Sequence, residues 1–398
     1  MTTTRTHGRR DVLLLALCQA LFMTSTAAIV SASALIGHML ADDKALATVP
    51  LSSQFIGMMA ATIPVSLLMK RIGRKDGFTV GLVIGLIGSG LAVHAVLEGH
   101  FILFCVASFL VGIMNAVGQY YRFAAADAAS EAYKSRAISL VMAGGIVASL
   151  GPLLANWSKG MFAPVDFAGV YVAVAALYGA SLLVLRFITI PRPSEEERTG
   201  KTRPLIQIIR QPTFIVAVTA GMAGYATMSL LMTATPLAMS VCGFTFFDTA
   251  QVIQWHVVGM YGPAFFTGSL IRRFGTSNIM LAGAVLLGAC AAVNLAGISL
   301  AHFWVGSVIL GVGWNFLFIG GTTLVTETYT PPEKAKAQGF NDFMVFGSVA
   351  AASLLSGVLH QGVGWQVMNY AVLPILGAVI IAVIWLARHN RRASPLEA

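Results

Sequence analysis

The sequence predicts an all-α membrane protein of twelve transmembrane helices, arranged as two pseudo-symmetric bundles of six. Hydrophobic residues make up 57% of the chain and charged residues 10%, whereas soluble domains carry about 25% charged residues. The apolar residues fall into runs long enough for helices that cross a bilayer, which takes about 20 residues each. Several residues and a short basic segment of the first half recur in the second half at a constant offset. This indicates an internal repeat in which the two copies have the same order of elements.

The clearest repeated landmark is a short basic hinge between two apolar runs. Residues 66–75 read SLLMKRIGRK, and residues 268–275 read GSLIRRFG. The same offset relates Gly81 to Gly283, Glu131 to Glu333, Lys134 to Lys336, Met142 to Met344 and Gly145 to Gly347. The two halves therefore have parallel, not inverted, order.

The apolar runs predict helices over 12–37, 48–69, 77–97, 101–124, 137–157, 167–188, 213–238, 247–270, 278–299, 302–326, 337–359 and 364–387. Residues 191–198 (PRPSEEER) are polar and contain two prolines, which is typical of a linker. The predicted organisation is an N-terminal bundle over 1–188, a cytoplasmic linker over 189–212 and a C-terminal bundle over 213–398.

Loops rich in basic residues alternate along the chain with loops that contain few, which is the pattern that sets membrane topology. With the N-terminus inside, all of the 25 lysines and arginines except Lys44, Lys159 and Arg122 fall in cytoplasmic segments. An excess of basic residues in cytoplasmic loops is the rule for inner-membrane proteins. We therefore expect a multi-pass protein of the cytoplasmic membrane with both termini in the cytoplasm, and we assign the net charge of +9 to topology and not to nucleic-acid binding.

Motifs for enzymatic chemistry are not found in the sequence. The four cysteines lie in or beside apolar runs without CxxC spacing, so we expect neither disulfides nor a metal site. The chain has no HExxH, GxSxG or Walker A pattern, and the first apolar run is longer than the core of a signal peptide. We expect no enzyme and no cofactor.

Two parallel six-helix repeats joined by a cytoplasmic linker resemble the major facilitator superfamily of secondary transporters. The hinge is similar to the superfamily's motif A, GxxxDRxGRR: Arg71, Gly73, Arg74 and Lys75 match, whereas Ser66 replaces the first glycine and Lys70 the aspartate. The resemblance implies a substrate site between the halves, a monomer, and a gate at the cytoplasmic side. The second copy keeps Gly268, Arg273 and Gly275.

The residues assigned to that gate are Arg71, Gly73, Arg74, Asp127, Arg136, Arg273 and Glu327. Asp127 and Glu327 resemble the family's acidic residues before the loops to helices 5 and 11. The expected pairs are Asp127 with Arg74 or Arg136, and Glu327 with Arg273 or Lys336; ordinary solvated loop acids are the alternative.

Polar residues inside predicted helices indicate where a substrate binds, because charges in the bilayer are costly. Arg122, Asn115 and Gln119 can share one face of the fourth helix, given their spacing; an arginine reaching the inner surface is the alternative. The other candidates for substrate contact are Tyr120, Gln19, Gln54, Tyr225, Trp314, Asn315 and Phe346. Asp342 and His256 are candidates for proton coupling, with a helix cap and a packing histidine as their alternatives.

The sequence therefore predicts a secondary active transporter that moves a small organic solute, a metabolite or a drug-like molecule, by alternating access with proton coupling. Arg122 and the aromatic residues indicate a substrate of aromatic or partly anionic character. The alternatives are a facilitative uniporter and a ligand sensor that does not transport. The expected partners are the small-molecule substrate and the lipid bilayer.

Overall fold

In the computed structural model, residues 3–121, 124–125, 141, 144–190 and 203–393 are described, and they are almost entirely helical. The first half contains α1 (Thr3–Leu40), η1 (Lys44–Leu46), α2 (Val49–Ile72), α3 (Arg74–Leu97), α4 (Phe101–Gly118), η2 (Gly144–Leu150), α7 (Gly151–Ser158) and α8 (Ala168–Arg186). The second half contains α10 (Leu205–Ile209), α11 (Pro212–Val241), α12 (Phe246–Tyr261), α13 (Ala264–Phe274), α14 (Thr276–Ala296), α15 (Leu300–Thr326), η3 (Pro331–Glu333), α16 (Lys334–Gly362) and α17 (Gly364–Ala393).

Ten helices in this described part are long and apolar enough to cross a membrane. Two of the twelve predicted spans are interrupted instead. The span predicted over 247–270 is divided into α12 and α13 at Gly262 and Pro263, because proline has no backbone N–H for the helical ladder. In the span predicted over 137–157, the described residues form η2 and then α7, with Pro152 in the first turn of α7.

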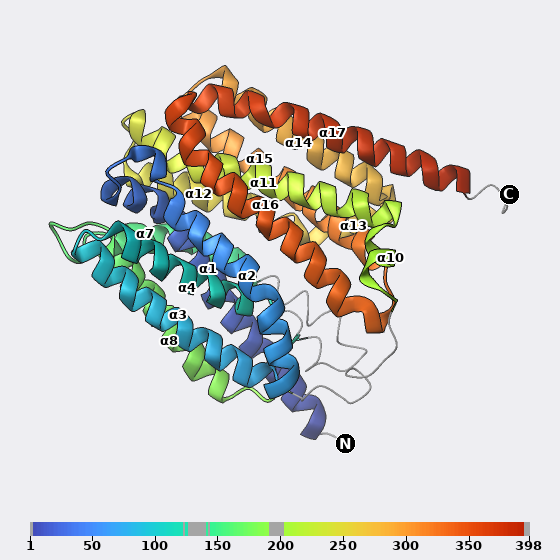
Figure 1. Ribbon diagram of the computed structural model, residues 1–398, viewed down its shortest axis with the longest axis horizontal. Helices are drawn as coiled ribbons and strands as arrows, with labels where there is room; N and C mark the ends of the chain where they lie inside the picture. Colours follow the sequence, from blue (N-terminus) through green and yellow to red (C-terminus); the bar gives the residue numbers. More distant parts are fainter. Residues whose placement is uncertain (1–2, 122–123, 126–140, 142–143, 191–202, 394–398) are drawn as a thin grey trace.

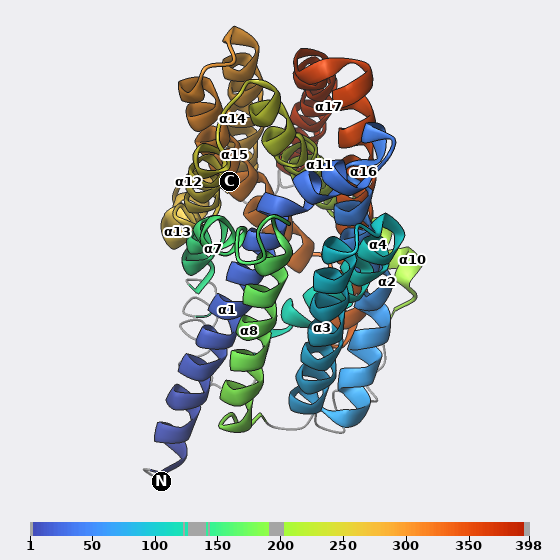
Figure 2. The same cartoon turned by 90° about the vertical axis from the view of Figure 1, so that its left-hand side faces the viewer.

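The two halves form two bundles that lie side by side (Figure 1). In the first half α4 packs on α2 and α3, and α8 packs on α1 and α3. In the second half α15 packs on α11, α12 and α14, and α17 packs on α11 and α14. The bundles meet through α2 against α16 and through η2 and α7 against α12. Figure 2 shows the first-half helices α1, α3 and α8 running alongside one another toward the N-terminus.

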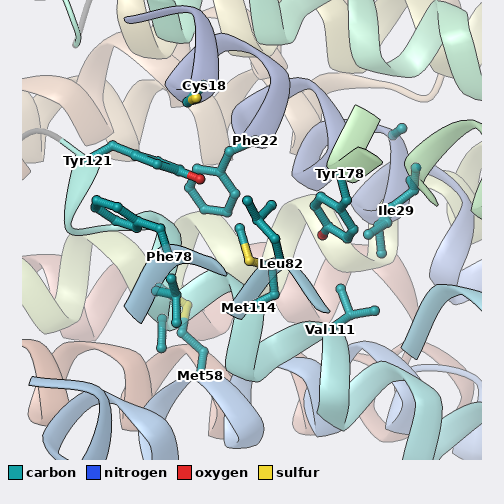
Figure 3. Packing of buried hydrophobic residues seen from close by; sticks show 14 of the residues in the cluster. Cys18, Phe22, Ile29, Met58, Phe78, Leu82, Val111, Met114, Tyr121 and Tyr178 are labelled. Carbon is teal, nitrogen blue, oxygen red and sulfur yellow. The ribbon is translucent and has the colours of Figure 1, made fainter. Parts of the chain in front are cut away.

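Each bundle has its own buried core. In the first bundle the Tyr121 ring stacks on Phe78 with centroids 4.3 Å apart, and Phe22 from α1 lies beside it (Figure 3). Close helix crossings add to this core: a Cβ on Gly112 would lie 2.0 Å from the carbonyl oxygen of Gln54. Small residues at such crossings are typical of packing between membrane helices.

The repeated basic hinge has the same backbone in both halves. Gly73 joins α2 to α3 with φ +91°, and Gly275 joins α13 to α14 with φ +84°. Their ψ angles are 161° and 150°, a region open essentially only to glycine. The glycine of the motif is therefore required by the turn itself.

Candidate functional site

The halves enclose a central cavity of about 150 Å³ that is lined by residues of both bundles. Of the side chains predicted from sequence to contact substrate or a proton, eight line it: Gln19, Asn115, Gln119, Tyr225, His256, Trp314, Asp342 and Phe346. They come from α1, α4, α11, α12, α15 and α16 or the turn after α4. Helices from both repeats thus supply one site.

One wall of the cavity is aromatic and belongs to the second bundle. We call Tyr225, Tyr261, Trp314, Phe318 and Phe346 the aromatic cluster. Trp314 and Phe318 stack with centroids 4.9 Å apart and planes 12° apart, since they are one turn apart on α15. Tyr225 meets Trp314 edge-on at 5.1 Å and Phe346 at 6.0 Å. Such a cluster offers flat apolar faces to an aromatic ligand.

The first bundle contributes amides to the lining, together with Phe22 and Phe55. Gln19 of α1 and Asn115 of α4 are buried, and Gln119 follows the end of α4. The oxygens Oε1 of Gln19 and Oδ1 of Asn115 are buried without a hydrogen-bond partner among the described residues. A buried polar atom left unpaired is costly, about 1–3 kcal/mol, so these atoms are suited to a polar ligand.

Two titratable side chains of the second bundle complete the lining. The Nδ1 atom of His256 lies 2.8 Å from the carbonyl oxygen of Ser307 on α15, and the ring is buried. Asp342 of α16 is half-buried, and its Oδ1 accepts a hydrogen bond from the Asn341 side chain at 3.0 Å. Each is placed to face whatever occupies the cavity.

Three predicted contact residues lie elsewhere. The Tyr120 hydroxyl is 3.3 Å from the Thr62 carbonyl oxygen on α2, and Gln54 is fully buried at the crossing with Gly112. Asn315 donates to the Met260 carbonyl at 2.6 Å and accepts from the Thr267 hydroxyl at 2.7 Å. It thereby ties α15 to both sides of the break between α12 and α13. Arg122 lies outside the described residues.

Sequence reasoning did not select several lining residues. They are chiefly Tyr261 and Phe318 together with the methionines Met23, Met58, Met228, Met232 and Met260. Phe318 could have been found from its four-residue spacing to Trp314, which places both rings on one face of a helix. The methionines carry no such signal, since apolar residues face lipid, core and cavity alike.

Of the residues predicted to form a gate, those in the described part of the chain lie at the end of the bundles that carries the chain termini. Lys75 donates to the carbonyl oxygens of Arg186 and Ile188 at 3.2 and 2.8 Å, which ties the start of α3 to the end of α8. Arg71 is exposed, and Arg74 follows Gly73 at the start of α3. Asp127 and Arg136 lie outside the described residues.

The second copy of the gate differs from the expected pairing. In the described part of the chain Glu327 makes no ion pair with Arg273 or Lys336; Arg273 lies over the Phe274 ring at 5.2 Å. Partial desolvation at the end of α15 raises the pKa of the Glu327 carboxyl. The ion pair found nearby is instead between Arg203, at the end of the linker, and Glu333, with Nη2 and Oε2 2.6 Å apart.

At the opposite end the two halves touch directly. The hydroxyl of Thr48, which precedes α2, accepts from the Gly357 backbone N–H at 3.1 Å and lies 3.3 Å from the Leu354 carbonyl oxygen on α16. On the other side of the interface Phe167 meets Phe246 edge-on at 5.2 Å. We call these contacts the seal; they join the two halves at the end away from the termini.

Comparison with known proteins defines the class of the chain. The sequence profile of the Major Facilitator Superfamily matches residues 15–262 and 256–398, and the chain belongs to that superfamily. It is a multi-pass membrane transporter. Solved structures share the fold: the peptide transporter PepTSo of the POT family has a TM-score of 0.73 at 12% identity, covering 98% of this chain and 99% of its own. The human organic anion transporter MFSD10 has a TM-score of 0.70 at 12% identity, covering 94% and 99%.

Curated relatives are more similar in sequence. The riboflavin transporter RfnT of Brucella anthropi is 40% identical over 96% of this chain and 97% of its own. YdeG of Bacillus subtilis, an uncharacterised MFS-type transporter, is 27% identical over 94% of this chain and 89% of its own.

Proposed function

We propose that this chain is a secondary active transporter that carries riboflavin, or a flavin of the same shape, across the cytoplasmic membrane by alternating access. The observation that carries the substrate class is the aromatic cluster on one wall of the central cavity, opposite unpaired amides. Riboflavin joins a flat three-ring system to a chain of hydroxyl groups, so it has one part for each wall. The 40% identity to a riboflavin transporter supports the same substrate.

The aromatic cluster favours such a ligand for energetic reasons. Offset-stacked or edge-to-face ring pairs contribute about 0.5–1.5 kcal/mol beyond the area they bury. Amides of Gln19 and Asn115 can each offer a donor and an acceptor to hydroxyl groups. A purely apolar solute would leave the buried Oε1 and Oδ1 atoms unpaired, which disfavours it.

The cavity must widen when the ligand binds. Its volume of about 150 Å³ is below the roughly 300–1,000 Å³ usual for ligand pockets. Four of the lining methionines, Met23, Met228, Met232 and Met260, come from both halves, and methionine side chains adapt readily. A small cavity beneath the seal supports a conformation between the two states of alternating access that are open to one side of the membrane or the other.

We propose proton coupling through Asp342 and His256, the acid and the histidine that line the cavity, with both termini in the cytoplasm and the protein acting as a monomer. The test is uptake of riboflavin by proteoliposomes with and without an imposed pH gradient, for the wild type and for Asp342→Asn. Coupling predicts uptake that follows the gradient in the wild type and loses this dependence in the variant. Gradient-independent uptake by the wild type would identify a facilitative uniporter, and riboflavin binding without uptake a sensor.

A further inference from the structure

We infer that His256 selects the flavin by its ring imide: the Nε2 atom of His256 accepts a hydrogen bond from the imide N–H of the bound ring. The inference rests on the proposed function and assigns one atom of the site to one atom of the ligand. It gives His256 a role in specificity, separate from carrying a proton.

The protonation of the histidine ring is set by its neighbour. Its Nδ1 atom lies 2.8 Å from the carbonyl oxygen of Ser307. A carbonyl oxygen can only accept, so Nδ1 must carry the hydrogen. In the neutral ring the lone pair is then on Nε2, and Nε2 can only accept. The hydrogen bond between α12 and α15 thus fixes which atom is presented to the cavity.

The presented atom needs a partner. His256 lines the central cavity, and its Nε2 is buried with no hydrogen-bond partner among the described residues. The hydrogen bond between Nδ1 and the Ser307 carbonyl oxygen holds the ring in place from the other side. A ligand that brings a donor to this atom relieves an unpaired buried group, and a ligand that lacks the donor leaves it unpaired.

The distance to the aromatic cluster matches a fused three-ring ligand. Ser307 and Trp314 are both on α15, seven residues apart. At 1.5 Å per residue this separates the level of His256 from the level of Trp314 by about 10 Å along the helix. A ring system stacked against the aromatic cluster and aligned with α15 extends over this distance. Its pyrimidine end carries the single N–H of the ring system, between two carbonyl groups, and reaches His256.

The test is a binding cycle with two ligands and three proteins. Riboflavin and 3-methylriboflavin differ in the imide, where the methyl group replaces the hydrogen. The proteins are the wild type, His256→Asn and His256→Gln, and affinity is measured by quenching of flavin fluorescence in detergent. The asparagine amide keeps a donor for the Ser307 carbonyl but is too short to reach the cavity, whereas glutamine places an amide oxygen near the position of Nε2.

The expected result is a wild type that binds riboflavin roughly tenfold more tightly than 3-methylriboflavin, the scale expected for an unpaired buried acceptor. In His256→Asn riboflavin binds more weakly than to the wild type, and the preference for riboflavin over the methylated ligand is lost. His256→Gln keeps the preference, although glutamine cannot titrate. A steric effect of the methyl group gives the other pattern, with riboflavin unchanged and the methylated ligand bound more tightly by His256→Asn.

Two failures are distinguishable. A wild type that does not bind riboflavin contradicts the proposed function and this inference together. A wild type that binds riboflavin but gives equal affinities for the two ligands, or the steric pattern, overturns the role of His256 and leaves the proposed function standing.

Discussion

Arg203 and Glu333, which are 130 residues apart in the sequence, form a bidentate ion pair. Arg203 Nε donates to Glu333 Oε1 and Nη2 donates to Oε2, each at 2.6 Å. The backbone N–H groups of Arg203 and Thr330 also donate to the carboxylate, at 2.9 and 3.0 Å, and Lys336 donates to the Arg203 carbonyl. This arrangement ties the end of the linker to the start of α16, the helix that contacts α2 of the other bundle.

The first prediction concerns the pH dependence of this ion pair. The Arg203 guanidinium and the Thr330 N–H hold the pKa of Glu333 well below its usual range. A depressed pKa in the folded state means that the pair stabilises the protein above the unfolded pKa of glutamate, about 4.3, and that the contribution is lost as pH falls below it. We expect Glu333→Gln to lower the thermal unfolding temperature at pH 7 and at pH 4, and the difference from the wild type to shrink as the pH falls from 4 toward 2.

The control is Glu98→Gln, which removes an exposed carboxylate at the end of α3. It should leave the unfolding temperature nearly unchanged at both pH values. An equal loss in Glu333→Gln at pH 7 and pH 2 would show that the carboxylate charge is not what the pair contributes.

The second prediction concerns the repeated hinge. Gly275 has φ +84° and an open surrounding, so a side chain there is disfavoured by the backbone alone. We expect Gly275→Ala to destabilise the protein by about 1–3 kcal/mol. Gly268, seven residues earlier, is helical and also has open space, and Gly268→Ala should be neutral or stabilising by up to about 1 kcal/mol. Equal effects in thermal unfolding would contradict the backbone argument.

The third prediction separates two neighbours on α15. Trp314 faces the cavity, whereas Asn315 bonds to Met260 and Thr267. We expect Asn315→Ala to destabilise by about 1–3 kcal/mol, because it leaves buried polar partners unpaired. Trp314→Leu should weaken riboflavin binding by about 0.5–1.5 kcal/mol or more, since the ring contact is lost. Thermal unfolding and fluorescence titration of both variants check this, and a reversed pattern would move the ligand away from Trp314.

The fourth prediction concerns the seal. A Cβ on Gly357 would lie 2.6 Å from the Thr48 hydroxyl and 2.9 Å from the Ala45 carbonyl oxygen. Gly357→Val should disfavour the closed seal by about 1–3 kcal/mol, the usual cost of overpacking. Cys242 lines a pocket beside the seal. In a protein whose other cysteines are replaced, we therefore expect Cys242 to react faster with a thiol reagent when Gly357→Val is present than when it is absent. Gly377→Val on α17, where added atoms meet nothing, should leave the rate unchanged; an equal change would disprove the link to the seal.

Much of this architecture could be predicted from the sequence because helices that cross a bilayer require long apolar segments, and basic loops mark their cytoplasmic ends. Apolar length and basic loops located the helices, and the second hinge glycine was visible as a repeat. The break at Pro263 was harder to place, since a proline inside a membrane helix can also be accommodated by a bend. Glycine and proline together at 262–263 were the available signal.

The site was only partly predictable for a different reason. Polar residues in apolar helices stand out, so Asn115, Gln119, Trp314 and Asp342 could be selected. Asn315 was selected by the same rule, yet it faces Met260 and Thr267, because sequence shows which residue is polar but not which way it points. The ion pair of Arg203 with Glu333 depends on how a linker folds against a distant loop, and no local pattern encodes that contact.

The most direct test of the central claim, that riboflavin passes between two bundles that move against each other, is uptake by a protein whose seal can be locked. The close approach at Thr48 and Gly357 brings these positions within reach of a disulfide, so Thr48→Cys and Gly357→Cys are combined in a protein without its native cysteines. Riboflavin uptake by proteoliposomes that hold the reduced double-cysteine protein is the reference, because the side chain added at position 357 also crowds the Ala45 carbonyl oxygen. Oxidation should reduce uptake to the level of protein-free liposomes, and reductant should restore it. Undiminished uptake with the cross-link formed would contradict alternating access through this cavity.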